Sequence, residues 1–211
     1  MEGIKNIIFD LGGVLLNIDY SKPLHAFQKL GINVNEQFYS QSRQSEVFDL
    51  LEIGKISEMD FVSFIQEKSE MKISYQDVID AWNSILLDFP IRRLQILQQL
   101  QLHYNLYLLS NTNEIHEKAF NQILFQTCGY PTLAVFFDKI YLSHRIGLRK
   151  PDPAIFELVI KENRLNKNET LFIDDSYQHI ESAEKIGLKT IHLSKGMTIE
   201  KDIFRPKKNT I

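Results

Sequence analysis

The stretch Asn6-Ile7-Ile8-Phe9-Asp10-Leu11-Gly12-Gly13 decides the fold of this 211-residue chain. A short apolar run ends at an aspartate, and two glycines follow where a tight turn would begin. Such a run is typical of a strand buried inside a parallel sheet. We therefore expect the first strand to end at Phe9, with Asp10 at its carboxyl end.

Two more apolar runs end in polar residues of the same kind. They are Tyr107-Leu108-Leu109-Ser110-Asn111 and Leu171-Phe172-Ile173-Asp174-Asp175. Strands are expected at Asn105–Leu109, Lys139–Leu142, Thr170–Ile173 and Thr190–Leu193, and helices between them at Ile91–Leu102, Asn113–Phe125, Pro153–Asn163 and Gln178–Ile186. Apolar strands that alternate with helices of about ten residues predict an α/β fold, a doubly wound parallel sheet covered on both faces.

The segment between the first and second strands has a different character. Ser57 and Ser74 each precede a helical pattern with an aspartate three residues on, which resembles a capping box with Asp in place of Glu or Gln. No strand pattern occurs there. We expect a small all-helical cap at residues 19–89 and an α/β core at residues 1–18 and 90–211.

Composition excludes several classes of protein. A net charge of −3 gives no electrostatic footprint for nucleic acid. The sequence contains no run of 18 apolar residues, the length that a membrane-spanning helix needs. Cys128 is the only cysteine, so neither an internal disulfide nor a cysteine zinc site can form. We expect a cytoplasmic protein without a targeting segment, either a monomer or a dimer.

The polar residues at the strand ends should meet, because ligands of doubly wound sheets bind outside the carboxyl ends of the strands. Asp10, Asp174 and Asp175 would repel one another there unless a hard cation such as Mg²⁺ lay between them. A carboxylate not held by the cation could attack phosphorus. The hydroxyl of Ser110 and the backbone N–H groups after it could hold phosphate oxygens, and Lys150 could offset their charge.

Each of these residues also has an ordinary structural explanation when taken alone. An aspartate before two glycines is usually a turn former, a Ser-Asn-Thr-Asn run is usually a helix cap, and Lys-Pro-Asp-Pro is usually a loop. Their occurrence in this order, at four strand ends, favours a site for phosphoryl chemistry.

In these motifs the whole chain resembles the haloacid dehalogenase-like (HAD) hydrolase superfamily, in the capped group that contains sugar-phosphate phosphatases. The resemblance implies a nucleophile at Asp10, a phosphate-binding hydroxyl at Ser110 and a catalytic lysine at Lys150. It also implies Mg²⁺ held by Asp10, by the backbone carbonyl of Gly12, and by Asp174 and Asp175. Asn111 joins Ser110, Lys150 and Gly12 as a candidate substrate-binding residue.

Three short segments narrow the resemblance further. They are Phe9-Asp10-Leu11-Gly12, Glu52-Ile53-Gly54-Lys55-Ile56-Ser57 and Tyr141-Leu142-Ser143 ahead of Arg149-Lys150-Pro151. They are most similar to bacterial glucose-1-phosphate phosphatases and to the phosphatase domain of bifunctional epoxide hydrolases.

One position departs from the family pattern. Family phosphatases usually carry a second Asp two residues after the nucleophile, which protonates the leaving oxygen, and here that position is Gly12. A missing general acid typically costs about 10²- to 10⁴-fold in rate. Asp19 is one hypothetical substitute, although an aspartate in a linker is more often a helix cap. The six histidines show no metal-ligand spacing, so we expect them to be structural or exposed.

These observations predict an Mg²⁺-dependent phosphatase that acts on a small phosphorylated metabolite, such as a sugar phosphate, through an aspartyl-phosphate. Two alternatives remain. One is a degenerate member that binds a phosphometabolite without turning it over, which Gly12 suggests. The other is a haloacid dehalogenase, but its chemistry needs no metal, and the acidic pair Asp174-Asp175 argues against it.

Overall fold

The computed structural model describes residues 1–34 and 46–205. Residues 35–45, within the expected cap, and 206–211, at the end of the expected core, lie outside the described part. The strands are β1 (Asn6–Phe9), β2 (Asn105–Ser110), β3 (Lys139–Leu142), β4 (Thr170–Asp174) and β5 (Lys189–His192). All five expected strands are present. β2 and β4 each end one residue later than predicted, and β5 begins and ends one residue earlier.

Nine α-helices occur in the described ranges. They are α1 (Ser21–Lys29), α2 (Glu46–Glu52), α3 (Glu58–Lys68), α4 (Tyr75–Asn83), α5 (Ile91–Leu100), α6 (Glu114–Cys128), α7 (Ser143–Ile146), α8 (Pro153–Asn163) and α9 (Tyr177–Lys185). Three further helical turns of other types are η1 (Leu133–Phe136), η2 (Lys167–Glu169) and η3 (Ile199–Ile203). None of the described helices combines the length and the apolar character that a membrane crossing requires.

The sheet is parallel throughout, and its strands lie in the order β3-β2-β1-β4-β5. The chain moves outward from β1 to β2 and β3, and then returns to the other side of β1 for β4 and β5. The point between β1 and β4 is therefore the topological switch point, where ligands of such sheets bind. Phe9 is in register with both Leu108 and Ile173, so the carboxyl ends of β1, β2 and β4 lie at the same edge of the sheet.

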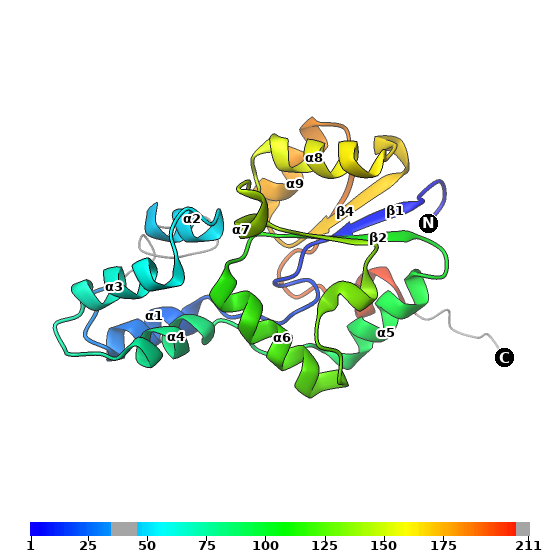
Figure 1. Cartoon of the computed structure of the whole chain (residues 1–211). Coiled ribbons are helices and arrows are strands. Elements are labelled where there is room, and N and C mark those ends of the chain that lie inside the picture. Colours follow the sequence, from blue (N-terminus) through cyan, green and yellow to red (C-terminus); the bar gives the residue numbers. More distant parts are fainter. Residues whose placement is uncertain (35–45, 206–211) are drawn as a thin grey trace.

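Alternate side chains of the strands enter two separate hydrophobic clusters. Ile7 and Phe9 pack with α5, α6 and η1 on one face, whereas Ile8 and Phe172 pack with α8 and α9 on the other. Figure 1 shows these helices on opposite sides of the sheet. The parallel sheet with helices on both faces confirms the expected α/β fold. Strands buried on both faces are mainly apolar, which is why the sequence showed them as apolar runs.

Helices α1 to α4 form a separate group beside the sheet, which we call the helical layer (Figure 1). Both predicted capping boxes are present: Ser57 and Ser74 accept hydrogen bonds from the backbone of Asp60 and Asp77, whose carboxylates accept from the serine backbone in return. The layer has its own hydrophobic cluster, to which α6 contributes Ile115.

Candidate active site

Three carboxylates meet at the switch point. Asp10 directly follows β1, Asp174 ends β4, and Asp175 comes next. Ligand oxygens from these three residues all lie within 4.8 Å of one another. Asp10 and Asp174 are buried and Asp175 is half-buried, so water screens their mutual repulsion poorly. The structure thus brings together the acidic residues that the sequence analysis placed at one edge.

The ammonium group of Lys150 lies between two of these carboxylates. Its Nζ donates to Asp10 Oδ1 at 2.6 Å and to Asp174 Oδ2 at 2.7 Å, and the side chain is completely buried. Burial alone would lower the pKa of Lys150, but the charges and hydrogen bonds of the two carboxylates outweigh it and raise this pKa. Lys150 therefore stays charged and fixes the orientation of the Asp10 carboxylate.

The pKa values of the three carboxyl groups shift in different directions. Burial, with the charge of Asp174, raises the pKa of Asp10 against the pull of Lys150. Burial also opposes ionisation of Asp174, yet Lys150 and His179 hold the pKa of Asp174 below its usual value. Burial and then the charges of Asp10 and Asp174 raise the pKa of Asp175 to about 8. With all three carboxyl groups ionised, the site would carry more negative charge than Lys150 can balance.

This donor set fits a hard divalent cation, which prefers carboxylate oxygens and would relieve the repulsion between Asp10 and Asp175. Asp174 is already engaged by protein groups: besides Lys150, its Oδ1 accepts the backbone N–H of Ser176 at 2.8 Å. Asp175 lies against the turn after β1, where any side chain at Gly13 would collide with its carboxylate. The fit is therefore best on the side of Asp10 and Asp175.

Ser110 and Asn111 continue the edge from the end of β2. Ser110 is buried and lines the cavity in front of Asp10. The Asn111 side chain brackets the backbone of Lys150: its amide donates to the Lys150 carbonyl at 2.8 Å, and its Oδ1 accepts the Lys150 N–H at 2.9 Å. Asn111 thus positions Lys150, and a substrate contact from this residue would have to come mainly from its backbone.

Gly12 lines the same cavity, and the space next to its Cα is taken by another residue. A Cβ atom at this position would lie 3.0 Å from Cδ1 of Ile18, closer than side chains normally pack. Ile18 therefore covers the place from which a second aspartate would extend.

The cavity runs from the carboxylates of Asp10 and Asp175 to the helical layer. Besides the carboxylate end, its wall includes groups from both parts of the chain: Ile18, Tyr20, Glu52, Ile85, Leu86, Thr112, His116, Phe120, Arg149, Ser176 and His179. Asp19 is not part of this wall. Its carboxylate accepts the N–H and hydroxyl of Ser21 at 2.9 and 2.6 Å, and these two bonds lower its pKa. Asp19 thus acts as a turn former at the start of α1.

Comparison with known proteins decides the family. The haloacid dehalogenase-like hydrolase family matches residues 4–187. The chain belongs to this family.

This haloacid dehalogenase-like hydrolase is similar to known proteins along nearly its full length. It is 34% identical to a D-ribitol-5-phosphate phosphatase of Bacteroides thetaiotaomicron over 92% of this chain and 93% of the relative. A crystal structure of a HAD family enzyme from the same organism, in complex with magnesium and inorganic phosphate, has a TM-score of 0.83 at 36% identity, covering 92% of this chain and 96% of that one. A HAD-like family hydrolase from Porphyromonas gingivalis has a TM-score of 0.81 at 32% identity, covering 92% of each chain.

These findings agree with the geometry of the site. The chain is a HAD phosphatase that acts on a phosphorylated metabolite. Related HAD structures hold magnesium, and the acidic cluster of this hydrolase fits the same ion.

The sequence analysis expected all six histidines to be structural or exposed, and the structure places two of them beside the candidate site. His179 Nδ1 lies 3.0 Å from each carboxylate oxygen of Asp174, and His116, the third residue of α6, lines the cavity. Both stand in the first turn of a helix that follows a strand bearing a site residue, and the first turn of such a helix faces the carboxyl edge of the sheet. This position in the helix was the sequence signal that could have placed the two histidines at the site.

His116 also connects the hydrolase core to the helical layer. Its ring stacks on Trp82 with centroids 4.5 Å apart, and its Nε2 lies 3.3 Å from the Trp82 carbonyl. Because a carbonyl only accepts, Nε2 carries the proton, and Nδ1 then accepts from the Asn113 amide at 3.2 Å. Burial lowers the pKa of His116 to about 4, so the ring is neutral at physiological pH.

Proposed function

We propose that this hydrolase releases phosphate from a small sugar or polyol phosphate, with Asp10 as nucleophile and an aspartyl-phosphate as intermediate. The observation that carries the proposal is the buried Lys150 ammonium between Asp10 and Asp174, beside Asp175, at the switch point of the sheet. The similarity to a D-ribitol-5-phosphate phosphatase supports a polyol or sugar as the leaving group.

Asp10 is suited to attack phosphorus because Lys150 holds one of its two oxygens. The bond between a carboxylate oxygen and phosphorus forms while the ester P–O bond breaks, and the substrate alcohol leaves. Water then attacks phosphorus, which releases phosphate and restores the carboxylate of Asp10. Lys150 contacts Asp10 throughout and stabilises the negative oxygens of the transferring group.

The remaining phosphate oxygens would meet Ser110 and the segment after it. The Ser110 hydroxyl lines the cavity, and Asn111 keeps the Lys150 backbone at a fixed place beside it. We assign Mg²⁺ to Asp10, Asp174, Asp175 and the backbone carbonyl of Gly12. When bound, the ion neutralises the carboxylates and draws the phosphate toward Asp10.

Gly12 leaves the departing oxygen without an acid from the usual position, and Asp19 is held by Ser21 outside the cavity wall. We assign the proton to water in the cavity, so substrates whose leaving group is already acidic, such as anomeric or aryl phosphates, should lose least from the missing acid.

We further propose that the helical layer is a cap, with residues 19–89 as the cap domain and residues 1–18 and 90–211 as the core domain. Tyr20, Glu52, Ile85 and Leu86 from this range form part of the cavity wall. A cap over the cavity admits small substrates and excludes bulk water during turnover.

The proposal is tested by phosphate release from p-nitrophenyl phosphate and a panel of sugar and polyol phosphates, with Mg²⁺ and with EDTA. We expect turnover only with Mg²⁺. After acid quenching, borohydride should reduce the acyl phosphate of Asp10 to a homoserine side chain with release of phosphate, and peptide mass spectrometry should locate this change. Turnover that continues in Asp10→Asn, or an adduct on a different residue, would contradict the assigned nucleophile.

A further inference from the structure

Ser143 is a completely buried serine at the junction between β3 and α7. Its hydroxyl holds the backbone of Thr112 on both sides of that residue: Oγ accepts the Thr112 N–H and donates to the Thr112 carbonyl, each at 2.9 Å. Ser143 also ends one of the three segments on which the narrower family resemblance rests, yet it has no part in the mechanism proposed above.

The end of the β2–β3 pair explains why Thr112 needs this partner. The two strands are in register up to Ser110 and Leu142. Beyond this pair the chain turns from β3 into α7, so the backbone of β3 does not continue alongside Thr112. Thr112 is only 5% exposed, and a buried backbone N–H or carbonyl without a partner is costly. The Ser143 hydroxyl supplies the hydrogen bonds that a longer strand would have made.

Thr112 belongs to the phosphate end of the cavity. Ser110, Asn111 and Thr112 all line the cavity, and we call them the phosphate segment. The Asn111 side chain holds the backbone of Lys150 by its own two hydrogen bonds. The phosphate segment is therefore fixed on two sides, by Lys150 at Asn111 and by Ser143 at Thr112.

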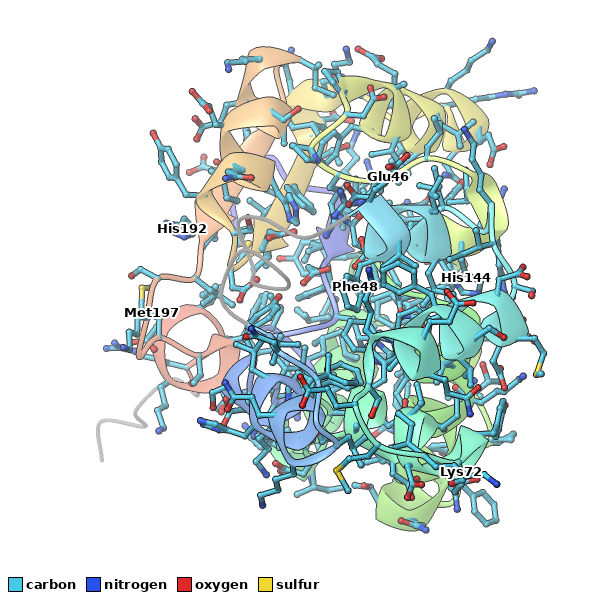
Figure 2. All side chains as sticks on the ribbon, turned by 90° about the vertical axis from the view of Figure 1, so that its left-hand side faces the viewer. Glu46, Phe48, Lys72, His144, His192 and Met197 are labelled. Carbon is cyan, nitrogen blue, oxygen red and sulfur yellow. The ribbon has the colours of Figure 1, made fainter. Side chains whose placement is uncertain are left out.

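The short helix α7 that begins with Ser143 is itself anchored on two neighbours. Arg145 donates two hydrogen bonds to the carboxylate of Glu117 in α6. The helical layer also fits closely on α7, because any side chain at Gly54 would collide with the His144 carbonyl. Figure 2 shows His144 beside the helical layer. These contacts leave Ser143 little freedom to move away from Thr112.

We propose that Ser143 is a positioning residue, which keeps the phosphate segment in the shape that presents the Ser110 hydroxyl to a phosphate group. The inference rests on the proposed function and goes beyond it by naming a residue that acts on phosphate only through the backbone of Thr112. A donor that is already oriented needs no rearrangement when its ligand binds, so its hydrogen bond contributes more to affinity.

The proposal distinguishes binding from chemistry. Without the Ser143 hydroxyl the phosphate segment loses one of its two supports, so phosphate should bind less tightly. The Lys150 ammonium keeps its place, because it is held directly by Asp10 and Asp174. The chemical step should therefore change much less than the affinity for phosphate.

Ser69 in the helical layer offers a matched control. Its Oγ lies 3.0 Å from the N atom and 2.9 Å from the carbonyl oxygen of Met71, so it holds the backbone of one residue in the same manner. Ser69 is not part of the cavity wall. Ser69→Ala thus removes a hydroxyl of the same kind at a place away from the phosphate segment.

The experiment titrates inorganic phosphate into the protein by calorimetry, with Mg²⁺ in excess. It compares wild type, Ser143→Ala, Ser110→Ala, the double variant and Ser69→Ala. We expect the Kd for phosphate to rise about tenfold in Ser143→Ala, as the loss of one or two hydrogen bonds allows, and to stay within about twofold in Ser69→Ala.

The double variant tests whether Ser143 acts through Ser110. If it does, Ser143→Ala should raise the Kd of the Ser110→Ala variant by less than about twofold, because the hydroxyl that it orients is already absent. Full additivity of the two substitutions would overturn the proposal. An unchanged Kd in Ser143→Ala, or an equal rise in Ser69→Ala, would overturn it as well.

Melting temperatures show whether each variant is folded. If Ser143→Ala does not fold, Ser143→Cys replaces it, since a thiol is of similar size but is a weak donor and acceptor. This variant should raise the Kd by about threefold or more, and an unchanged Kd would again contradict the positioning role.

Kinetics provide a second readout and separate this inference from the proposed function. With p-nitrophenyl phosphate, Ser143→Ala should raise KM about tenfold and lower kcat by less than about threefold. Turnover by wild type tests the proposed function on its own. If wild type binds phosphate but releases none from any ester, the proposed function fails while the titrations still decide the role of Ser143. If wild type binds no phosphate, both fail.

Discussion

The molecule buries two clusters of opposite character. In the helical layer Trp82 packs against Phe27, Phe48 and Phe61, with centroids 4.9 to 6.4 Å from its own, and all four side chains are fully buried. At the edge of the sheet the buried groups are charged: Lys150, Asp10 and Asp174. We call these the aromatic cluster and the charged cluster.

The difference shows how burial can serve stability in one place and chemistry in another. Aromatic burial stabilises the fold through apolar area and ring contacts. Buried ion pairs contribute little net stability, because removing charges from water cancels most of their attraction. The charged cluster is thus better explained by reactivity, and a substitution in each cluster should change a different property.

The largest expected effect is that of Asp10→Asn, which should change catalytic activity without lowering stability. Asp10→Asn should lower kcat by about 10⁴-fold or more, because the nucleophile is lost. The free energy of unfolding should stay the same or rise, since burial raises the pKa of Asp10 and its charged form is disfavoured in the fold. Steady-state kinetics and urea denaturation at pH 7 check both parts. A large loss of stability would mean that the charged cluster also holds the fold together.

Trp82→Ala should show the opposite behaviour. Loss of the central ring should cost about 3–5 kcal/mol in urea denaturation, as large-to-small changes at buried aromatic sites do. Tyr75→Ala in the same helix, at a side chain that is 38% exposed, is the matched control and should cost under about 0.5 kcal/mol. Similar costs for both variants would show that the aromatic cluster is not the stabilising part of the layer.

Lys150→Met should lower both the stability and the catalytic activity. Without the ammonium, Asp10 and Asp174 face each other without a cation, which should cost about 3–5 kcal/mol at pH 7. The loss should shrink toward pH 5, because protonation of a carboxyl group removes the repulsion. Lys161→Met, at an exposed position on α8, is the control for both denaturation and activity. A stable Lys150→Met variant at pH 7 would contradict the argument.

His116, which joins the two parts, should give the smallest effect, and only in acid. Burial lowers its pKa from 6.5 to about 4, so between these values the unfolded chain binds more protons and stability falls as pH falls. The shift corresponds to at most about 3 kcal/mol. His116→Gln should remove up to this amount from the loss of stability between pH 7 and pH 4. Denaturation curves across this range check it, and an unchanged slope would rule out His116 as the source.

The charged cluster could be predicted from the sequence for a simple reason. Asp10, Ser110 and Asp174 each end an apolar run, and parallel strands bring such ends together at one edge. The two capping boxes of the helical layer were also predictable, because each depends on residues only three positions apart.

What the sequence did not predict depends on contacts between distant residues. Glu52 and Arg149 lie 97 positions apart, and neither has a local pattern that points to the other. The only sequence signal for His116 was its place in the first turn of a helix. Its stacking on Trp82 depends on how the helical layer packs on α6. Such pairs follow from the packing of whole elements, which residue periodicity does not encode.

The contact between Ile18 and Gly12 has a consequence for how this chain can evolve. An aspartate introduced at position 12 would place its Cβ 3.0 Å from Cδ1 of Ile18, so the end of the isoleucine side chain would have to move by a few tenths of an ångström. The effect of gaining the acid and the effect of a smaller residue at position 18 should therefore be coupled rather than additive. A smaller residue at position 18 would make the acid less costly to gain, so the order in which the two changes arise affects how readily the chain acquires it.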